Sequence, residues 1–395
     1  MDSRVLCSIK ISEITRMAAR ASLAFLGQED VILSSDPQVT YFVEQYKGAT
    51  PFAQRVDTVN FETNWLTFGS EAWARVPRIG DLITNMYFKI DFPVNELGSS
   101  AVLDSAGTLM IHTAELWIGS QLVERLWGEH LALLWDLEVP QSKQGALLEL
   151  IGKGTTVPAS SYTIPLPFRL FKKGLPIGDD DVYIHLTLHP SATFTNPPIN
   201  LNSQIKARLD TEFTYLSNEE MDFIRKNPQL YIFEQIQKEN FFVLQGINQV
   251  TCHLNFINPV KELYLTIQND TARGYDYSNV TGGSSDQLVN MTLLFNSTDR
   301  ISSEVGTPIF LRNIQGLEFH TRVPDYLFYM YSFSLDPESE SPTGHVNFSR
   351  IDNQTLMLQL SPSLANRYVT VWAQSYNFLL VENGKAQVVF KNFIT

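Results

Sequence analysis

Histidine and aspartate side chains that lie close together in one segment are the first candidates for chemistry, because both can bind metal ions. His185 and His189 are four residues apart, within the alternating segment 182–189 that predicts a strand. On a helix this spacing brings two side chains together, but on a strand it separates them by about 13 Å, at about 3.3 Å per residue. Zinc–nitrogen bonds are about 2.0 Å long, so these histidines cannot share one ion. We interpret them as part of a solvated or interface face.

The three acids Asp179, Asp180 and Asp181 suggest calcium as a second possibility. A calcium loop needs several oxygen ligands at set spacing and a glycine that lets the loop fold back. Gly178 precedes the acids, yet the repeating D-x-D-x-D-G pattern is missing. We therefore interpret the segment as a charged turn ahead of the strand 182–189.

Enzyme signatures are missing from the sequence. It contains no G-x-S-x-G turn, no H-E-x-x-H motif, no phosphate-binding loop and no G-x-G-x-x-G after a strand. Residues 282–285, Gly-Gly-Ser-Ser, have no following lysine and do not form a phosphate site. Composition alone permits a Ser/His/Asp triad, but no motif supports one. We predict no catalytic residue, no cofactor and no metal site.

Six N-x-S/T sequons lie in the second half of the chain, and they begin at Asn269, Asn279, Asn290, Asn296, Asn347 and Asn353. The first four surround the polar segment 269–286, which predicts a long surface loop, and these four are the candidate glycosylation sites. A protein assembled in the cytosol would not meet the glycosylating enzymes. For Asn347 and Asn353, which open and close one seven-residue motif, we prefer a structural role.

The elements that must position these residues are mostly strands. Phe (25) and Tyr (15) are abundant, and aromatic side chains favour pleated surfaces. Apolar or alternating segments bounded by turn residues predict strands in both halves. Those of the first half span 54–61, 72–76, 81–92, 182–189 and 206–216, and the two prolines in 162–168 confine that segment to a sheet edge or bulge. Those of the second half span 231–237, 241–244, 261–268, 289–295, 326–333, 355–360, 368–382 and 385–390. Asn383-Gly384 predicts a hairpin turn between the last two.

Short helices interrupt the strands. Residues 126–138 fit both a helix and a strand, and we favour a helix. Residues 141–151 predict another helix, ended by Gly152. Residues 218–226 predict a linker helix capped by Asn218, and 308–315 a short helix.

Length and charge limit the functional class. A chain of 395 residues suits two domains, and a net charge of −13 disfavours direct binding to nucleic acid phosphates. Its two cysteines, Cys7 and Cys252, form no CxxC motif, which suits a reducing compartment. No apolar run reaches the roughly 18 residues that span a bilayer, and the start of the chain lacks a signal peptide pattern.

Residues 1–26 have a local charge of +2 and apolar residues near helical spacing. We expect either a partly disordered arm or a short helix that contacts a neighbour or a membrane.

One stretch, His320–Asn353, carries a specific resemblance. An aromatic strand follows Val323-Pro324, a proline/glycine turn comes next, and the motif NFSRIDN spans 347–353. Together with RIGDLIT at 78–84 and similar segments at 27–42 and 162–168, the stretch resembles the major capsid proteins of large icosahedral double-stranded DNA viruses. The resemblance covers most of residues 27–383.

The resemblance implies an all-β fold of two consecutive antiparallel jelly-roll sandwiches with short helical excursions. The implied organisation is an N-terminal arm (1–26), a first jelly roll (27–217), a linker helix (218–228) and a second jelly roll (229–395). The implied function is structural: homotrimeric, pseudo-hexameric capsomers that tile an icosahedral shell and are assembled in the host cytoplasm. The implied partners are neighbouring capsomers, minor capsid proteins and, through the arm, an internal membrane.

Two alternatives remain open. One is a minor or vertex capsid paralogue with the same double jelly roll, and the other is a carbohydrate-binding or hydrolytic β-sandwich. Two departures from the family pattern also stand out. The chain is shorter than many members, and 382–385 form a hairpin where the family runs on with small residues.

Overall fold

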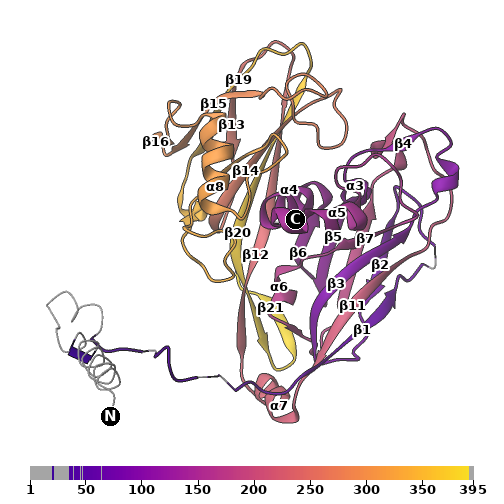
Figure 1. Cartoon of the computed structure of the whole chain (residues 1–395), viewed down its shortest axis with the longest axis vertical. Helices are drawn as coiled ribbons and strands as arrows, with labels where there is room; N and C mark the ends of the chain where they lie inside the picture. Colours follow the sequence, from indigo (N-terminus) through magenta and orange to yellow (C-terminus); the bar gives the residue numbers. More distant parts are fainter. Residues whose placement is uncertain are drawn as a thin grey trace, which may run out of the picture. The chain divides into compact units, whose positions relative to one another are not determined.

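A computed structural model describes residues 20–21, 35–38, 40–44, 46, 48–63 and 65–390. The chain divides into two compact units, Met1–Thr50 and Pro51–Thr395. Most of the expected N-terminal helix and of the 27–42 motif lies outside the described residues. The second unit contains the sandwiches shown in Figure 1.

The first sandwich consists of two four-stranded layers. One has the order β1-β11-β3-β7, and the other has the order β2-β9-β5-β6. The bounds of these strands are β1 Ala53–Asn60, β2 Glu71–Arg75, β3 Leu82–Asp91, β5 Ile111–Ile118, β6 Gln121–Trp127, β7 Ser161–Pro165, β9 Val182–Leu188 and β11 Ala207–Tyr215. The short strand β8 (Leu175–Pro176) pairs with β3, and β4 (Ala101–Val102) and β10 (Thr195–Asn196) form a separate two-stranded sheet. As the two prolines of 162–168 predict, β7 lies at an edge of its path.

The second sandwich repeats this arrangement. Its layers have the orders β12-β20-β14-β17 and β13-β19-β15-β16. The bounds are β12 Gln229–Val243, β13 Gln249–Leu254, β14 Pro259–Asn269, β15 Leu288–Phe295, β16 Thr298–Ile301, β17 Tyr329–Ser332, β19 Gln354–Leu360 and β20 Arg367–Glu382, with β18 (Val346–Asn347) and β21 (Lys385–Val388) as short additions.

Numbering the eight principal strands of each half from 1 to 8 gives the same two layers twice, 1-8-3-6 and 2-7-4-5. This is the strand order of a jelly roll, in which two Greek keys form one sandwich. In the described residues, strands that precede 218–226 in the sequence pair only with one another, and so do the strands that follow it. The predicted double jelly roll is confirmed, including a structural repeat that the sequence does not show.

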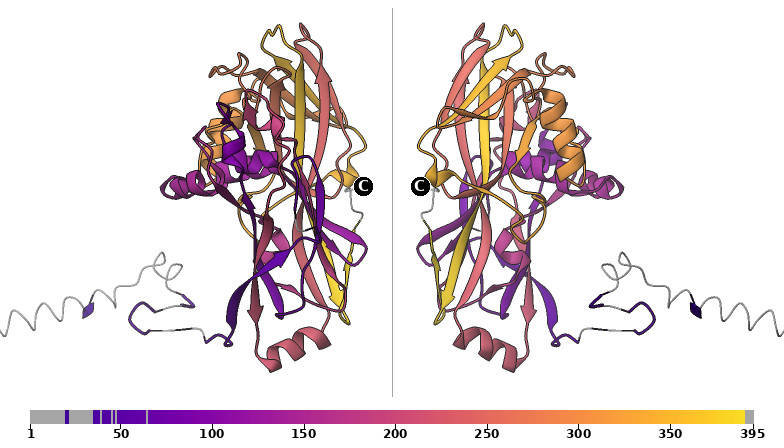
Figure 2. Two further views of the ribbon diagram at one scale, coloured as in Figure 1. Left: turned by 90° about the vertical axis from the view of Figure 1, so that its right-hand side faces the viewer. Right: turned by 90° about the vertical axis from the view of Figure 1, so that its left-hand side faces the viewer.

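Helices occupy the connections. The α-helices are α3 Ala106–Met110, α4 Gly128–Glu138, α5 Gln144–Ile151, α6 Arg169–Lys172, α7 Asn218–Lys226 and α8 Gln315–Phe319. A π-helix, η4 (Ile309–Ile314), leads directly into α8, and short 3-10 turns are η1 Val94–Glu96, η2 Gln141–Lys143, η3 Ser191–Thr193 and η5 Phe348–Arg350. Figure 2 shows α7 at the end of this unit opposite β13, β15 and β19.

Several predicted elements are confirmed with small shifts. The helix predicted from 126 begins at Gly128, because Leu126 and Trp127 complete β6. Gly152 ends α5 with a φ of 77°, and Asn383 and Gly384 turn the β20–β21 hairpin with φ values of 51° and 75°.

Three expectations are corrected. The cap of α7 is Ser217, whose Oγ accepts from the amide of Glu220 at 3.3 Å, so Asn218 is the first helical residue. Segments 231–237 and 241–244 form one strand, β12, because β20 pairs with it along its whole length. The predicted strand 326–333 narrows to β17, and the residues before Tyr329 leave the sheet.

The predicted surface loop 269–286 is partly buried. Tyr275 and Tyr277 are within the core cluster of the first sandwich, and the Tyr275 hydroxyl donates to the Thr108 hydroxyl at 2.9 Å. The loop therefore covers the first sandwich while its glycine-rich tip, 281–285, is exposed.

Candidate functional site

No strand pairs across the two sandwiches in the described residues, so their interface is not a shared sheet. The outward face of the layer β12-β20-β14-β17 is buried against α4, α6 and β6 of the first sandwich. Trp372 of β20 is fully buried there, with its ring centroid 5.5 Å from that of Trp127 and 5.6 Å from that of His130. The Lys238 ammonium lies 4.3 Å from the Trp372 ring centre. Aromatic contacts of Trp372 with Trp127 and His130 thus join the halves, and Lys238 packs on Trp372 from within the second sandwich.

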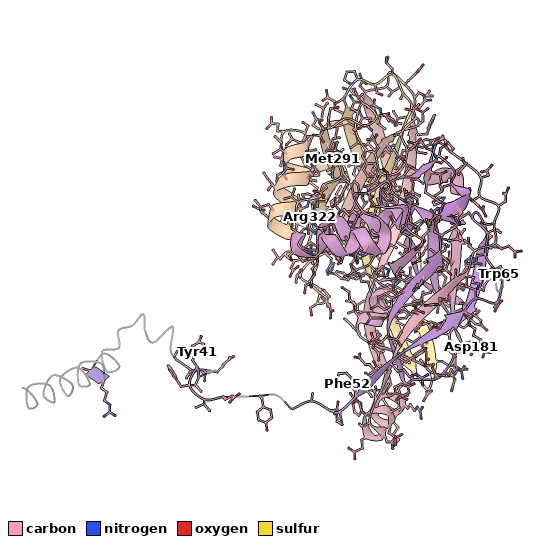
Figure 3. The ribbon with its side chains drawn as sticks, turned by 45° about the vertical axis from the view of Figure 1, so that its right-hand side comes forward. Tyr41, Phe52, Trp65, Asp181, Met291 and Arg322 are labelled. Atoms are coloured by element: carbon pink, nitrogen blue, oxygen red, sulfur yellow. The ribbon has the colours of Figure 1, made fainter. Side chains whose placement is uncertain are left out.

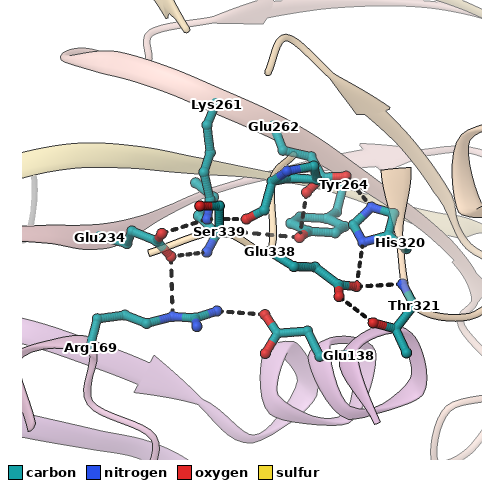
Figure 4. Close-up of polar contacts among 12 residues, drawn as sticks. Glu138, Arg169, Glu234, Lys261, Glu262, Tyr264, His320, Thr321, Glu338 and Ser339 are labelled. Carbon is teal, nitrogen blue, oxygen red and sulfur yellow. Dashed lines mark hydrogen bonds and ion pairs between the residues drawn. The ribbon is translucent and has the colours of Figure 1, made fainter. Parts of the chain in front are cut away.

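A buried ionic network lies beside this aromatic cluster (Figure 4). Arg169 of α6 contacts Glu138 of α4 at 2.6 Å and Glu234 of β12 at 3.1 Å. Lys261 of β14 contacts the other oxygen of Glu234 at 2.5 Å. Burial alone would raise the pKa of Glu234, but Arg169 and Lys261 hold it below its ordinary value. A movement that separated Arg169 from Glu234 would leave a buried charge without its partner, so the network fixes the relative position of the sandwiches.

Glu124 adds a further carboxyl group to the network. Both of its carboxyl oxygens accept from the Arg169 backbone amide, at 3.0 and 3.1 Å. Burial raises the pKa of Glu124 to about 8. The nearby Arg169 and Lys261 already face Glu138 and Glu234, so a neutral Glu124 keeps this part of the network free of surplus negative charge.

His320, the first residue of the family-like stretch, lies between two carboxylates. Its Nε2 is 2.7 Å from Glu262, and its Nδ1 is 3.2 Å from Glu338. Burial alone would lower the pKa of His320, but these two carboxylates raise it to about 10. The imidazolium is therefore charged at neutral pH and holds the 336–343 loop against β14.

We expect His320→Gln to be most harmful at low pH. Because the folded pKa exceeds the unfolded value of about 6.5, the stabilisation is complete below pH 6.5 and is lost as pH rises toward 10. Near pH 6 the loss should be roughly 3 kcal/mol. Urea unfolding of both proteins from pH 6 to 10 measures this, and the gap should shrink steadily. His253→Gln, at an exposed position on β13, is the control, and a gap that stays constant with pH would contradict the expectation.

A second network joins α4 to the segment before β17. The fully buried Asp136 carboxylate contacts Lys153 at 2.6 Å and Arg322 at 2.7 Å. Its other oxygen accepts from the backbone amides of Asp325 and Tyr326, at 2.7 and 3.0 Å. Figure 3 shows Arg322 of the second sandwich beside α4 of the first. Asp136 thus anchors the residues before β17, including the start of the predicted strand 326–333.

The predicted charged turn at 179–181 also joins the halves. Asp181 pairs with Arg75 at 2.8 Å and with Arg78 at 2.9 Å. Asp180 accepts from the Ala386 amide at 2.9 Å, and the Asp179 amide donates to the Gly384 carbonyl at 2.7 Å. The turn therefore binds the β20–β21 hairpin of the second sandwich.

The two histidines of the predicted strand 182–189 have separate partners: His185 lies in β9 and His189 directly follows it. His185 stacks on Trp73, with ring centroids 4.2 Å apart, and contacts Glu115 at 3.0 Å. His189 instead contacts His112 at 3.2 Å. Within the part of the chain that the structure describes, no group of three or more His, Cys, Asp or Glu residues is arranged to hold a metal ion.

The four candidate glycosylation sites differ in exposure. Asn269 is buried, and its side-chain amide donates to the carbonyls of Ser278 and Asn279. Asn279 and Asn290 are half-buried, whereas Asn296 is exposed in the β15–β16 turn. Glycosylation stays a prediction, and Asn296 presents its side chain most openly.

The NFSRIDN motif has local structural partners. Asn347 caps η5 by accepting from the Ser349 amide at 3.1 Å. The Asn353 amide donates to the Asn296 side chain at 3.0 Å, and Phe348 between them is buried.

Sequence analysis missed the interface networks. Lys261 and Glu262 were a signal, since they place two charges inside an otherwise apolar strand, but nothing local identifies their partners. Among the described residues, no helix is long and apolar enough to cross a membrane.

Known proteins with similar sequences include viral major capsid proteins. Residues 40–179 match a family model described as "Major capsid protein N-terminus", and residues 220–387 match "Large eukaryotic DNA virus major capsid protein". The chain is 26% identical to the major capsid protein of Pyramimonas orientalis virus, over 94% of this chain and 98% of that protein. It is 23% identical to that of Paramecium bursaria Chlorella virus 1, over 94% and 99%.

Solved structures agree on the fold. The quasi-atomic model of the PBCV-1 virus capsid superposes with a TM-score of 0.78 at 19% identity, covering 89% of this chain and 100% of that one. The Faustovirus major capsid protein superposes with a TM-score of 0.70 at 12% identity, covering 96% and 98%.

Proposed function

Because this chain belongs to the family of large eukaryotic DNA virus major capsid proteins, and is therefore a structural component of the virion, we propose that three copies form one pseudo-hexameric capsomer. The observation that supports this most strongly is the doubled strand order. Two similar sandwiches in each chain give six in a ring of three. A closed ring uses each complementary patch once, which favours a finite assembly.

The networks between the sandwiches support the same proposal. A ring closes only if the angle between its sandwiches is held constant. The buried ion pairs Asp136–Arg322 and Arg169–Glu234 each join one half to the other, and a shift would separate these charges from their partners. The two halves should therefore behave as one rigid block.

We assign no catalytic role to the chain, and with a net charge of −13 we assign it no direct contact with the genome. We keep 27–217 and 229–395 as the two jelly-roll domains, joined by the linker 218–228. The N-terminal arm, 1–26, is proposed to contact minor capsid proteins or an internal membrane. Capsomers then tile the shell by contacting their neighbours.

Solution mass tests the capsomer. Light scattering of the purified chain should give about three times 44.8 kDa. Deleting residues 1–26 should leave three chains per particle, because the proposed ring is built from the sandwiches. A stable monomer at capsid-like concentration would contradict the proposal.

A further inference from the structure

The structural repeat has one face covered within the chain and an equivalent face left open. In the second sandwich, the outward face of β12-β20-β14-β17 is covered by α4, the helix that follows the fifth principal strand of the first sandwich. The residues of this covered face include Trp372 and Tyr264, which are 0% and 2% exposed. The equivalent layer of the first sandwich is β1-β11-β3-β7.

That equivalent face is open to solvent. We call it the sheet face, defined by its outward residues Val56, Thr58, Asn60, Tyr87, Lys89, Arg208, Asp210 and Glu212. Val56 is 57% exposed, although the inward Val59 on the same strand is 3% exposed. Lys89 and Arg208 are opposite each other in the β3–β11 register and line a surface pocket with Lys206. The sheet face is thus uncovered, and it carries the basic Lys89 and Arg208 beside the acidic Asp210 and Glu212.

The counterpart of α4 is also uncovered. The helical segment η4–α8 follows β16, the fifth principal strand of the second sandwich. We call its outer side the helix face, and it exposes Ile309 (65%), Ile314 (38%) and Leu317 (76%). Its inner side is packed, since Leu311 and Gln315 are buried. Acidic Glu304 and Glu318 are exposed beside these apolar residues.

We infer that the helix face of one copy packs against the sheet face of the next copy, repeating between chains the contact that α4 makes within a chain. This inference rests on the proposed trimer and names its contacting surfaces. The faces are different, so the contact is head-to-tail, and a head-to-tail contact closes into a ring when its rotation permits. Figure 1 shows α8 and β1 on different sides of the two-sandwich unit, so one copy can use both faces at the same time.

Two lysines support this pairing. The sheet face and its rim carry Lys89, Lys206 and Arg208 together with Asp91, Asp210 and Glu212, and Arg208 is already paired with Asp210 at 3.0 Å. The cations that can face Glu304 and Glu318 of the helix face are therefore Lys89 and Lys206. Opposite charges across an interface favour the correct partner and orientation. The exposed apolar residues of the helix face supply the surface that is buried on contact.

Paired variants test the inference. Leu317→Asp damages the helix face and Val56→Asp the sheet face, and both positions are exposed, so each chain should keep its fold. We expect each variant alone to be a monomer by light scattering. A one-to-one mixture should give a heterodimer of about twice 44.8 kDa, because each chain retains one intact and complementary face. Leu364→Asp, at a residue 96% exposed in the β19–β20 connection, is the matched control and should remain trimeric.

The outcomes separate the two proposals. Trimeric variants beside a trimeric wild type would overturn the inference and leave the capsomer intact. Monomeric variants whose mixture stays monomeric would overturn the head-to-tail pairing. A monomeric wild type would overturn the proposed function. Should either variant misfold, Val56→Cys/Leu317→Cys in one Cys7→Ser chain should form covalent trimers with a short bismaleimide, and failure of a trimeric sample to cross-link would count against the inference.

Discussion

Replacing Asp136 with alanine should destabilise the chain by about 3–5 kcal/mol, because this substitution removes one partner from a buried ionic network. The carboxylate is fully buried and contacts both Lys153 and Arg322. Without it, the nearly buried Lys153 loses this counter-ion, and Arg322 is left with its pair to the exposed Asp325. The amides of Asp325 and Tyr326 also lose their acceptor, and an unsatisfied buried donor costs about 1–3 kcal/mol. Denaturant unfolding at neutral pH measures the loss.

Asp222→Ala is the matched control for this substitution. Asp222 forms an exposed ion pair with Lys226 on α7, at 3.2 Å. Exposed pairs of this kind contribute about 0.3–0.5 kcal/mol, so the control should unfold almost like the wild type. If Asp136→Ala stayed within about 1 kcal/mol of the wild type, the network would not anchor the segment before β17.

Replacing Trp372 with alanine should cost about 3–5 kcal/mol, as is usual for a large aromatic side chain removed from a core. Trp372 is fully buried between the sandwiches and packs against Trp127, His130 and Lys238. The cavity would open between the two sandwiches of one chain and loosen the block from which the proposed trimer is built, so the assembly should dissociate at lower denaturant concentration than that of the wild-type chain. Thermal unfolding and light scattering of the same samples measure both effects.

Trp65→Ala separates interface packing from the simple loss of a tryptophan. Trp65 is 48% exposed on the first sandwich (Figure 3) and lies under the Lys206 ammonium at 5.3 Å. About half of its surface is buried, against all of that of Trp372, so stability should change by roughly 1–1.5 kcal/mol. Equal losses from both tryptophans would show that Trp372 has no special place at the interface.

Local pattern was enough for most elements and for the family. The alternation in 182–189 and 261–268 predicts strands because side chains on a strand point to opposite faces in turn. Asn383-Gly384 predicts a hairpin because these residues tolerate positive φ. The motif at 347–353 identified the capsid family from residue identities alone. Each of these signals lies within a few consecutive residues.

Tertiary structure alone decided how the two halves meet. Asp136 and Arg322 are 186 residues apart, and no local pattern pairs them. The segment 326–333 is uniformly apolar because β17 buries part of it in the second sandwich, while Tyr326 and Leu327 pack against the core of the first. The repeated strand order is likewise invisible in the sequence, because many different side chains satisfy the same alternation of inward and outward positions. Burial depends on which surfaces meet in space, so the interface had to be seen in the folded chain.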